Sequence, residues 1–255
     1  MQNEILISPH FLDKPLPQLE ALAEPGASLV KPQPGEGDTQ HRILPMLEAI
    51  AAHTTRALEH GRRPVSIAGD CCSAIGVAAG LERAGQSPVL VWLDAHGDFN
   101  TWETTPSGFL GGMPLAMLVG RGEQTLLRGL GIQPLSQDRV ILCDARDLDP
   151  AERVALEHSG VSRLFHLSTL REHPLMSRPI WIHFDVDIVN PDDAPAMSYR
   201  ATGGPSAAQV RSLFRALSQE ANVVAVSMST WNPELDRDGM TQNVCMDLLT
   251  TLIGH

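Results

Sequence analysis

Two short clusters of acidic residues are the part of this chain best suited to chemistry. Asp94, His96 and Asp98 follow the apolar run Pro-Val-Leu-Val-Trp-Leu, and Asp185 and Asp187 follow Pro-Ile-Trp-Ile-His-Phe. Successive side chains of a β-strand alternate between faces, so residues at i, i+2 and i+4 converge on one side. Carboxylates at that density repel one another, and a bound cation is the usual counter-charge. The paired spacing therefore predicts a two-metal hydrolytic centre rather than solvated charges at loop ends.

The clusters end predicted strands in a chain that alternates between strand-like and helix-like segments. Short β-branched runs predict strands, and apolar residues at helical spacing predict the helices between them. We therefore predict a three-layer α/β/α fold with a mostly parallel sheet, in which ligands bind beyond the carboxyl ends of the strands. The predicted strands cover residues 64–69, 88–94, 139–143, 179–185 and 222–227, and the predicted helices cover 40–60, 73–84, 207–218 and 242–252.

The bulk composition is that of one globular α/β domain, which we predict to span residues 1–255. Forty-three per cent of the 255 residues are hydrophobic, enough for a substantial core. The Pro- and Gly-rich segments at 24–37 and 200–206 are typical of loops, not of linkers between domains. A net charge of −11 argues against a nucleic-acid surface. It fits a cationic substrate or bound divalent metal, and equally an ordinary soluble protein.

Nothing in the sequence predicts export or membrane insertion. The N-terminus, Met-Gln-Asn-Glu-Ile-Leu-Ile, lacks the basic region and the apolar stretch of a signal peptide. No apolar run reaches the roughly 18 residues of a membrane span. The four cysteines have neither zinc-knuckle nor redox spacing, so we predict a reduced, cytoplasmic protein. They are Cys71, Cys72, Cys143 and Cys245.

Taken in chain order, several motifs resemble those of the ureohydrolase superfamily of arginase and agmatinase. The match runs from about residue 64 to the C-terminus, and the order of the blocks makes it specific. The resemblance implies the arginase-deacetylase-like form of the α/β/α fold. The blocks are Asp70-Cys71-Cys72-Ser-Ala-Ile-Gly, Asp94-Ala-His96-Gly-Asp98, Ser107-Gly-Phe-Leu-Gly-Gly-Met-Pro114, Arg146-Asp147-Leu-Asp149-Pro, Phe184-Asp185-Val-Asp187, and Asn232-Pro233 followed by Asp238-Gly-Met-Thr.

The superfamily hydrolyses guanidino groups with two Mn²⁺ ions bridged by a hydroxide, releasing urea and an amine. A guanidinium is a poor electrophile, and two ions can lower the pKa of a shared water enough to attack it. Oxygen-rich ligands with one imidazole suit Mn²⁺ better than Zn²⁺ or Cu²⁺. The resemblance implies six metal ligands: Asp94 and Asp185 between the ions, Cys71 and Asp98 at one ion, and His96 and Asp187 at the other.

Two residues depart from the superfamily pattern at the metal centre. Cys71 stands where most relatives have a histidine ligand, and a thiolate favours softer metals than Mn²⁺. Either Cys71 is a ligand, or it is an inert buried cysteine and that ion is held more loosely. His183 stands where relatives usually carry serine, two residues before Asp185 on the same strand face. We predict Asp98 and His183 as catalytic residues, with His183 orienting Asp98 or reaching the first metal; the alternative is a core histidine.

Two further departures concern proton transfer and the guanidinium. Gly111 replaces the loop histidine that arginases use as a proton shuttle, and Thr230 replaces the glutamate that holds the guanidinium. A hydroxyl cannot replace a carboxylate paired with a buried cation, so another acid is needed. Glu234, Asp236 and Asp238 in the next loop are candidates, although solvated loop charges explain each of them better.

The residues around the predicted site favour an arginine-like substrate. By the resemblance, Asn100 and Ser107 contact the carboxylate end of the amino acid, and Asp149 contacts its α-amino group. Phe109 replaces a polar residue of this rim, and Tyr199 falls in the loop after Asp187. A rim changed in this way could accept a larger arginine derivative, such as arginine within a peptide.

We therefore predict a binuclear manganese amidinohydrolase that converts an arginine side chain, free or peptidyl, to ornithine and urea. The alternatives are a hydrolase of agmatine, formiminoglutamate or another such compound, a non-catalytic relative that binds or scaffolds, and a two-metal phosphoesterase. The retained metal carboxylates favour catalysis, and no basic cluster suggests a phosphate site. The predicted partners are a guanidino substrate and possibly further copies of the chain, since the superfamily often forms oligomers.

Overall fold

An eight-stranded sheet forms the centre of the protein in a computed structural model that describes residues 1–23, 26–229 and 231–254. The strand order is β4-β1-β5-β10-β9-β6-β7-β8, and every neighbouring pair is parallel. The strands are β1 (Asn3–Ser8), β4 (Ser28–Leu29), β5 (Arg63–Ala68), β6 (Val89–Asp94), β7 (Val140–Asp144), β8 (Ser162–Leu164), β9 (Ile180–Asp185) and β10 (Val223–Ser229).

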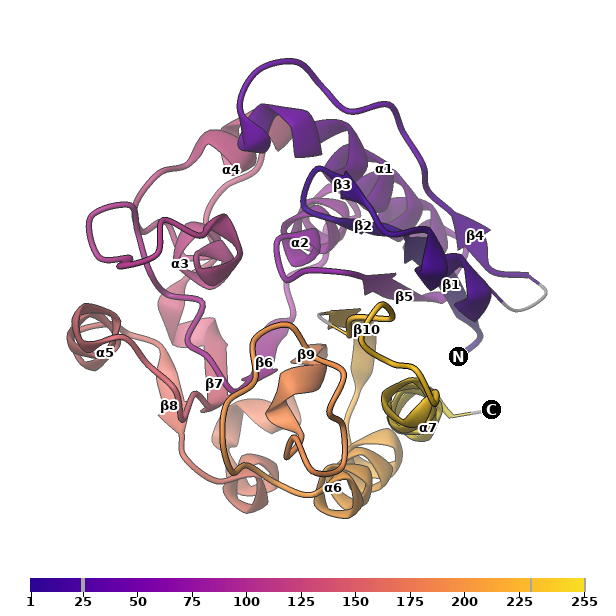
Figure 1. Ribbon diagram of the computed structural model, residues 1–255, viewed down its shortest axis with the longest axis vertical. Coiled ribbons are helices and arrows are strands. Elements are labelled where there is room, and N and C mark those ends of the chain that lie inside the picture. The colour runs from indigo at the N-terminus through magenta and orange to yellow at the C-terminus, as the bar shows by residue number, and fades with distance from the viewer. Residues whose placement is uncertain (24–25, 230, 255) are drawn as a thin grey trace.

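Helices cover both faces of this sheet, as Figure 1 shows. On one face lie α1 and α2, with the shorter α3 and α4 beside them, and on the other lie α6 and α7 (Figure 1). The predicted three-layer α/β/α fold with a parallel sheet is thereby confirmed. The helices are α1 (Thr39–Glu59), α2 (Ser73–Arg83), α3 (Pro114–Leu118), α4 (Thr125–Leu130), α5 (Pro150–Glu157), α6 (Ala207–Glu220) and α7 (Met240–Ile253).

The central strands are apolar on both faces because both faces are covered. In β6, Leu90 and Trp92 pack into the core under α1 and α2, whereas Val89, Val91 and Leu93 pack into the core under α6 and α7. All six residues of β6 and of β9 are buried. Continuous apolar runs are the expected signature of such strands, because alternation disappears when neither face meets water.

The predicted elements agree with the structure to within two residues at most ends. The sequence did not predict β1, β4 and β8, the short helices α3 to α5, or the small antiparallel pair of β2 (His10–Phe11) and β3 (Lys14–Pro15). These elements are short or lie near the sheet edges, so their hydrophobic pattern is weak. No helix among the described residues is long and apolar enough to cross a membrane.

The strand order brings the two acid clusters to one edge of the sheet. β6 and β9 are neighbours, and the carboxyl ends of parallel strands meet at the same edge. Cys71 follows β5, which lies two strands from β9 with β10 between them. Residues separated by more than one hundred positions in the chain therefore surround one point.

Helices α1 and α2 approach each other most closely at Gly80. A Cβ atom there would lie 2.4 Å from the Thr54 Cβ and 2.6 Å from the Ala51 carbonyl oxygen. Neither atom lies at the end of a flexible side chain, so the helices themselves must separate to relieve the contact.

We expect Gly80→Ala to lower the free energy of unfolding by about 1–3 kcal/mol, the usual cost of overpacking a core. Chemical denaturation measures it. The matched control is Gly112→Ala, because no atom lies within 4 Å of its added Cβ, and it should change stability by less than about 0.5 kcal/mol. Equal effects of the two substitutions would contradict close helix packing as the cause.

Candidate metal centre

The turn after β9 directs its acids toward the turn after β6. The backbone N–H of Asp187 donates to Asp185 Oδ1 at 2.8 Å, which closes the turn. Asp187 Oδ1 in turn accepts the N–H of Ala95 at 3.1 Å, and Asp187 Oδ2 lies 2.8 Å from His96 Nδ1. The N–H of His96 donates to Asp94 Oδ1 at 2.7 Å. Backbone donors of each turn thus hold the carboxylates of both clusters in place.

Two groups of potential metal ligands form at this edge. The first donor group is Cys71, Asp94 and Asp185, and the second donor group is Asp94, His96 and Asp187; within each group the ligand atoms all lie within 4.8 Å of one another. Asp94 belongs to both groups, which is the arrangement a pair of ions sharing a carboxylate requires. The structure therefore brings together five of the six predicted ligands.

The sixth predicted ligand, Asp98, lies at the same site but in neither donor group. Its backbone has a φ of +48°, in the left-handed region that non-glycine residues seldom adopt. Its side chain is buried, and Oδ2 has no hydrogen-bond partner among the described residues. An orphaned carboxylate oxygen in a buried site is costly unless a proton or a cation meets it.

His183 lies behind Cys71 and away from solvent. Its Nε2 is 3.4 Å from Cys71 Sγ and 3.3 Å from Ser229 Oγ, and its Nδ1 is 2.8 Å from Ser227 Oγ. Asp98 is not among these partners, so the structure supports neither a hydrogen bond that orients Asp98 nor a place for His183 in the donor groups. Its predicted catalytic role stays a prediction.

The crowded acids hold protons more tightly than isolated carboxyl groups. Burial, with the charge of Asp187 added, raises the pKa of Asp94 to about 6. Burial also raises the pKa of Asp185 and of Asp98 well above the usual range, assisted by neighbouring carboxylates. A bound divalent cation would reverse this, because it favours the ionised form of every carboxylate around it. The donor set therefore fits a divalent metal.

The two histidines of the site have opposite electrostatic surroundings. Burial lowers the pKa of His96, but its contacts with Asp187 and Asp94 outweigh that effect and raise it to about 12. Burial lowers the pKa of His183 to about 3, only weakly opposed by the charge of Asp94. His183 is therefore neutral over the physiological range, whereas His96 is the counter-charge of the second donor group.

Arg146 fixes the loop that carries Asp187. Its guanidinium donates to the backbone carbonyls of Asp187 at 2.9 Å and Ile188 at 3.2 Å, and to that of Ala201 at 3.3 Å. It also pairs with the carboxylate of Asp144 at the end of β7. One side chain thus joins three segments around the site, with its charge neutralised by Asp144.

A cavity of about 190 Å³ opens above the acids and contains the three predicted substrate-binding residues. Asn100, Ser107 and Asp149 all line it, and Asn100 Nδ2 donates to Asp149 Oδ2 at 2.9 Å. Phe109 and Tyr199 also line it, with their ring centroids 4.9 Å apart. The predicted rim residues therefore lie together on one surface.

Three acids of the cavity, Asp70, Asp147 and Glu152, were not predicted as site residues. Glu152 Oε1 accepts the N–H of Phe99 at 2.8 Å, and Oε2 accepts that of Asp149 at 3.2 Å. Burial raises its pKa to about 7. Asp70 accepts the N–H of Leu12 at 2.7 Å, and burial raises its pKa to about 6. The Asp-Pro-Ala-Glu spacing, a capping-box pattern, was the available signal for Glu152.

The acids proposed to replace the guanidinium-binding glutamate do not line the cavity. Asp236 accepts from the Trp231 indole and from the backbone N–H of Thr241, at the start of α7. Glu234 and Asp238 are exposed. Thr230 lies outside the described residues. Gly111, which replaces the loop histidine, does line the cavity.

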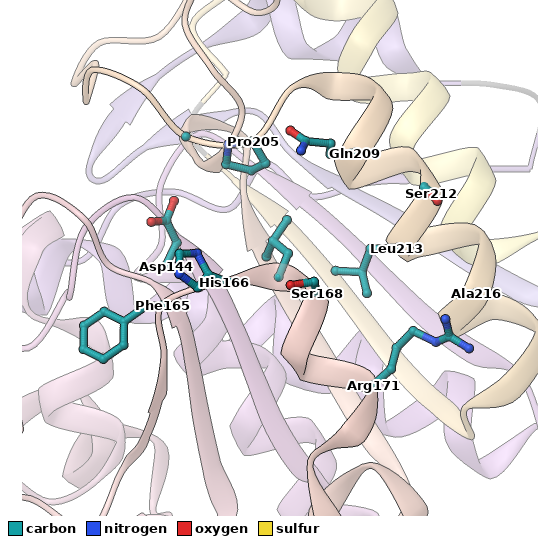
Figure 2. Close-up of a pocket in the computed structure, with 12 residues that line it drawn as sticks. Asp144, Phe165, His166, Ser168, Arg171, Pro205, Gln209, Ser212, Leu213 and Ala216 are labelled. Atoms are coloured by element: carbon teal, nitrogen blue, oxygen red, sulfur yellow. The ribbon is translucent and has the colours of Figure 1, made fainter.

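A larger hollow, of about 730 Å³, lies on the α6 side of the sheet (Figure 2). The side chains drawn in Figure 2 come from the end of β7, from residues 165–171, and from α6 and the loop before it. Arg171 lies at one end of the hollow and Asp144 lies toward the other. None of the predicted site residues lines it. The larger volume of this hollow therefore does not make it the candidate site. The candidate site is the smaller cavity, which most of the predicted site residues line.

The sequence matches the arginase family model over residues 33–254. The chain belongs to the arginase family. The arginase of Bacillus subtilis (strain 168) is 30% identical over 224 residues, covering 83% of this chain and 76% of that protein. The N(omega)-hydroxy-L-arginine amidinohydrolase of Streptomyces lavendulae is 28% identical over 225 residues, covering 86% of this chain and 80% of the relative.

Solved structures of arginases share the fold of this family member. A crystal structure of arginase from Bacillus subtilis superposes with a TM-score of 0.86 at 24% identity and covers 100% of this chain and 99% of its own. Membership confirms the predicted superfamily and the predicted class of enzyme, a hydrolase acting on guanidino or amidino groups. It also sets aside the phosphoesterase alternative. Enzymes of this family are generally metal-dependent, which agrees with the two donor groups.

The metal-free protein should lose stability as the pH rises above about 6.5, the ordinary pKa of histidine. The folded-state pKa values of Asp94, Asp98 and Asp185 lie above their unfolded values, so folding is favoured most when these groups are protonated. That stabilisation disappears as the pH rises through the folded-state pKa values. The lowered pKa of His183 acts only below about pH 6.5, outside this window.

Denaturation in the presence of a chelator tests this, and Asp98→Asn should flatten the pH dependence because it removes one ionisable buried group. Asp192→Asn, which alters an exposed acid of the next loop, is the control and should behave as wild type. Metal-free protein that becomes more stable as the pH rises above about 6.5 would contradict the expectation.

Proposed function

We propose that the protein is a binuclear manganese amidinohydrolase that hydrolyses an arginine side chain, free or within a peptide, to ornithine and urea. The observation that carries the proposal is the shared carboxylate of Asp94, which joins two donor groups beneath one acidic cavity. A single site would need only one donor group, and a structural acid cluster would not need the orphaned oxygen of Asp98.

The donor chemistry supports manganese at both positions. The second donor group offers two carboxylates and one imidazole, and the first offers two carboxylates and one thiol. Hard oxygen ligands favour Mn²⁺, with sulfur as the one softer donor. When bound, such an ion pair supplies a water acidic enough to act as a nucleophile near neutral pH.

The protein's own residues bind and position the substrate. The cavity lining is rich in acids, including Asp70, Asp147 and Asp149, which favours a cationic side chain. Glu152 holds the backbone of Phe99 and Asp149, so it positions the rim that carries Asn100 and Asp149. Asp98 lines this cavity, and its Oδ2 has no hydrogen-bond partner among the described residues, so it is the group placed to hold or move a proton beside the metals.

The mouth of the cavity supports a substrate larger than free arginine. Phe11 and Phe109 stack with ring centroids 6.1 Å apart, and Phe109 contacts Tyr199 on its other side. These three rings also line an adjoining hollow of about 500 Å³, together with Trp102. Flat apolar rings beside a cationic site suit the stem and backbone of a peptidyl arginine.

Some related proteins are named for substrates other than free arginine, which agrees with a substrate rim that differs between members of the family. Besides N(omega)-hydroxy-L-arginine amidinohydrolase, the fold is shared by a proclavaminate amidino hydrolase from Streptomyces clavuligerus, at a TM-score of 0.72. Agmatine or a formimino compound stays the alternative substrate, and a non-catalytic binding role the alternative function. Assembly into a homo-oligomer and a cytoplasmic location are further parts of this proposal, from the sequence.

The test is urea release by Mn²⁺-loaded protein from free arginine, from an arginine-containing peptide with blocked ends, and from agmatine. We expect urea from an arginine side chain, with the peptide at least as good a substrate as free arginine. Urea from agmatine alone would replace the substrate assignment. No urea from any of them, with two ions bound per chain, would contradict the proposed function.

Asp94→Asn should lower the rate of urea release by more than about 100-fold, because even residues behind metal ligands often contribute 10- to 100-fold. Metal content measured alongside should fall as well. Asp192→Asn, an exposed acid five residues beyond Asp187, is the charge-matched control and should retain full activity. Comparable losses of urea release in both variants would contradict the proposed role of Asp94.

Phe109→Ala should raise KM for a peptide substrate by roughly tenfold, the scale of one lost hydrophobic contact, with a smaller change in kcat. The KM for free arginine should change less, because the free amino acid extends less far into the aromatic mouth. Trp102→Ala provides the graded comparison, because Trp102 lines the adjoining hollow but not the cavity above the acids. Equal changes in KM for both substrates would argue against peptide binding at this rim.

A further inference from the structure

A row of buried side chains crosses three strands directly beneath the first donor group. Ser227 of β10 lies opposite His183 of β9, and His183 lies opposite Trp92 of β6. Trp181, two residues before His183, points to the same face of the sheet. All four side chains are excluded from solvent. The row is therefore cut off from water, and its polar atoms must find their partners within it.

The hydrogen bonds along this row have a defined direction. Trp181 Nε1 donates to Ser227 Oγ at 3.0 Å, since an indole nitrogen can only donate. The hydroxyl hydrogen of Ser227 then has one acceptor among the described residues, the Nδ1 atom of His183 at 2.8 Å. With Nδ1 as acceptor, the ring proton of a neutral His183 lies on Nε2.

The Nε2–H so defined faces the sulfur of Cys71 and the hydroxyl of Ser229. These atoms lie 3.4 Å and 3.3 Å from Nε2, and Cys71 Sγ is itself 3.0 Å from both Ser229 Oγ and Asp185 Oδ2. The Trp92 ring covers the imidazole with a centroid separation of 3.9 Å. The imidazole of His183 thus has a partner at each ring nitrogen, and the Trp92 ring packs against its face.

From this arrangement we propose that His183 is a positioning residue that donates Nε2–H to the Cys71 sulfur and holds it as a ligand of the first donor group. The inference rests on the proposed metal centre and specifies how its one sulfur donor is kept in place. A hydrogen bond to the sulfur orients it and lowers its charge density, as partners behind metal ligands commonly do. Trp181 and Ser227 act one step further back, by fixing the tautomer.

The first measurement is made on the wild-type protein. Cobalt-loaded protein should show a near-ultraviolet sulfur-to-cobalt charge-transfer band, and Cys71→Ser should abolish it. ¹⁵N spectra of histidine-labelled protein should place the His183 proton on Nε2. Absence of the band, its persistence in Cys71→Ser, or a proton on Nδ1 would each overturn the inference, and the first and last of these are read from the wild-type protein alone.

Variants then separate positioning from packing. His183→Leu and Ser227→Ala should each weaken cobalt binding at the sulfur-containing site by about 10- to 100-fold. His183→Gln, whose amide can still donate toward the sulfur, should retain more affinity than His183→Leu. The matched control is Ser66→Ala, because Ser66 lies opposite Ser227 on β5 and its hydroxyl is buried without a partner in the described residues.

Ser66→Ala should bind cobalt as wild type does, and an equal loss there would mean that packing alone explains the row. The outcomes also distinguish this inference from the proposed function. Urea release by a wild-type enzyme that shows no sulfur band would contradict only the role of His183. A sulfur band with the expected variant series, but no urea from any substrate, would contradict only the proposed function.

Discussion

Repulsion among buried carboxylates is the constraint on which the rest of this structure depends. Asp94, Asp98, Asp185 and Asp187 meet at the ends of two neighbouring strands, almost wholly out of water. Ionised together they would be strongly unfavourable, and the raised pKa values of Asp94, Asp98 and Asp185 are the direct consequence. A fold that keeps such a cluster must gain elsewhere the stability that the cluster costs. The gain comes from the continuous apolar cores on the two faces of the sheet.

The chain counters the repulsion with fixed donors before any ion is bound. Backbone N–H groups of Ala95, His96 and Asp187 point at carboxylate oxygens, and the cationic ring of His96 contacts Asp187. Because these donors belong to the turns that carry the acids, the geometry is set by the same residues that create the charge. Among the described residues, Asp98 Oδ2 is left without a hydrogen-bond partner, and a cation is one group that could meet it.

Cys71 and the buried His183, the two departures from the superfamily pattern at the metal centre, lie next to each other. Cys71 places a sulfur among oxygen and nitrogen donors, and His183 Nε2 lies 3.4 Å from that sulfur. Ser227 and Ser229 of β10 connect the pair to the next strand. The departures that make the sequence look atypical are thus adjacent in space, whereas in the chain they lie more than one hundred residues apart.

The sequence by itself determined the five central strands of the sheet, their ends and the identity of the acids. The apolar runs can be recognised in the sequence because strands buried on both faces must be apolar throughout. The acids can be recognised because they follow those runs, at the edge of the sheet where ligands bind. The edge strand β8 and the short helix α5 were not predicted, since their hydrophobic signal is short. Only the tertiary structure decided which partner His183 takes, that Glu152 faces the cavity and that the acids of the 234–238 loop do not. Each of those depends on side-chain direction across several strands and loops, which no local pattern encodes.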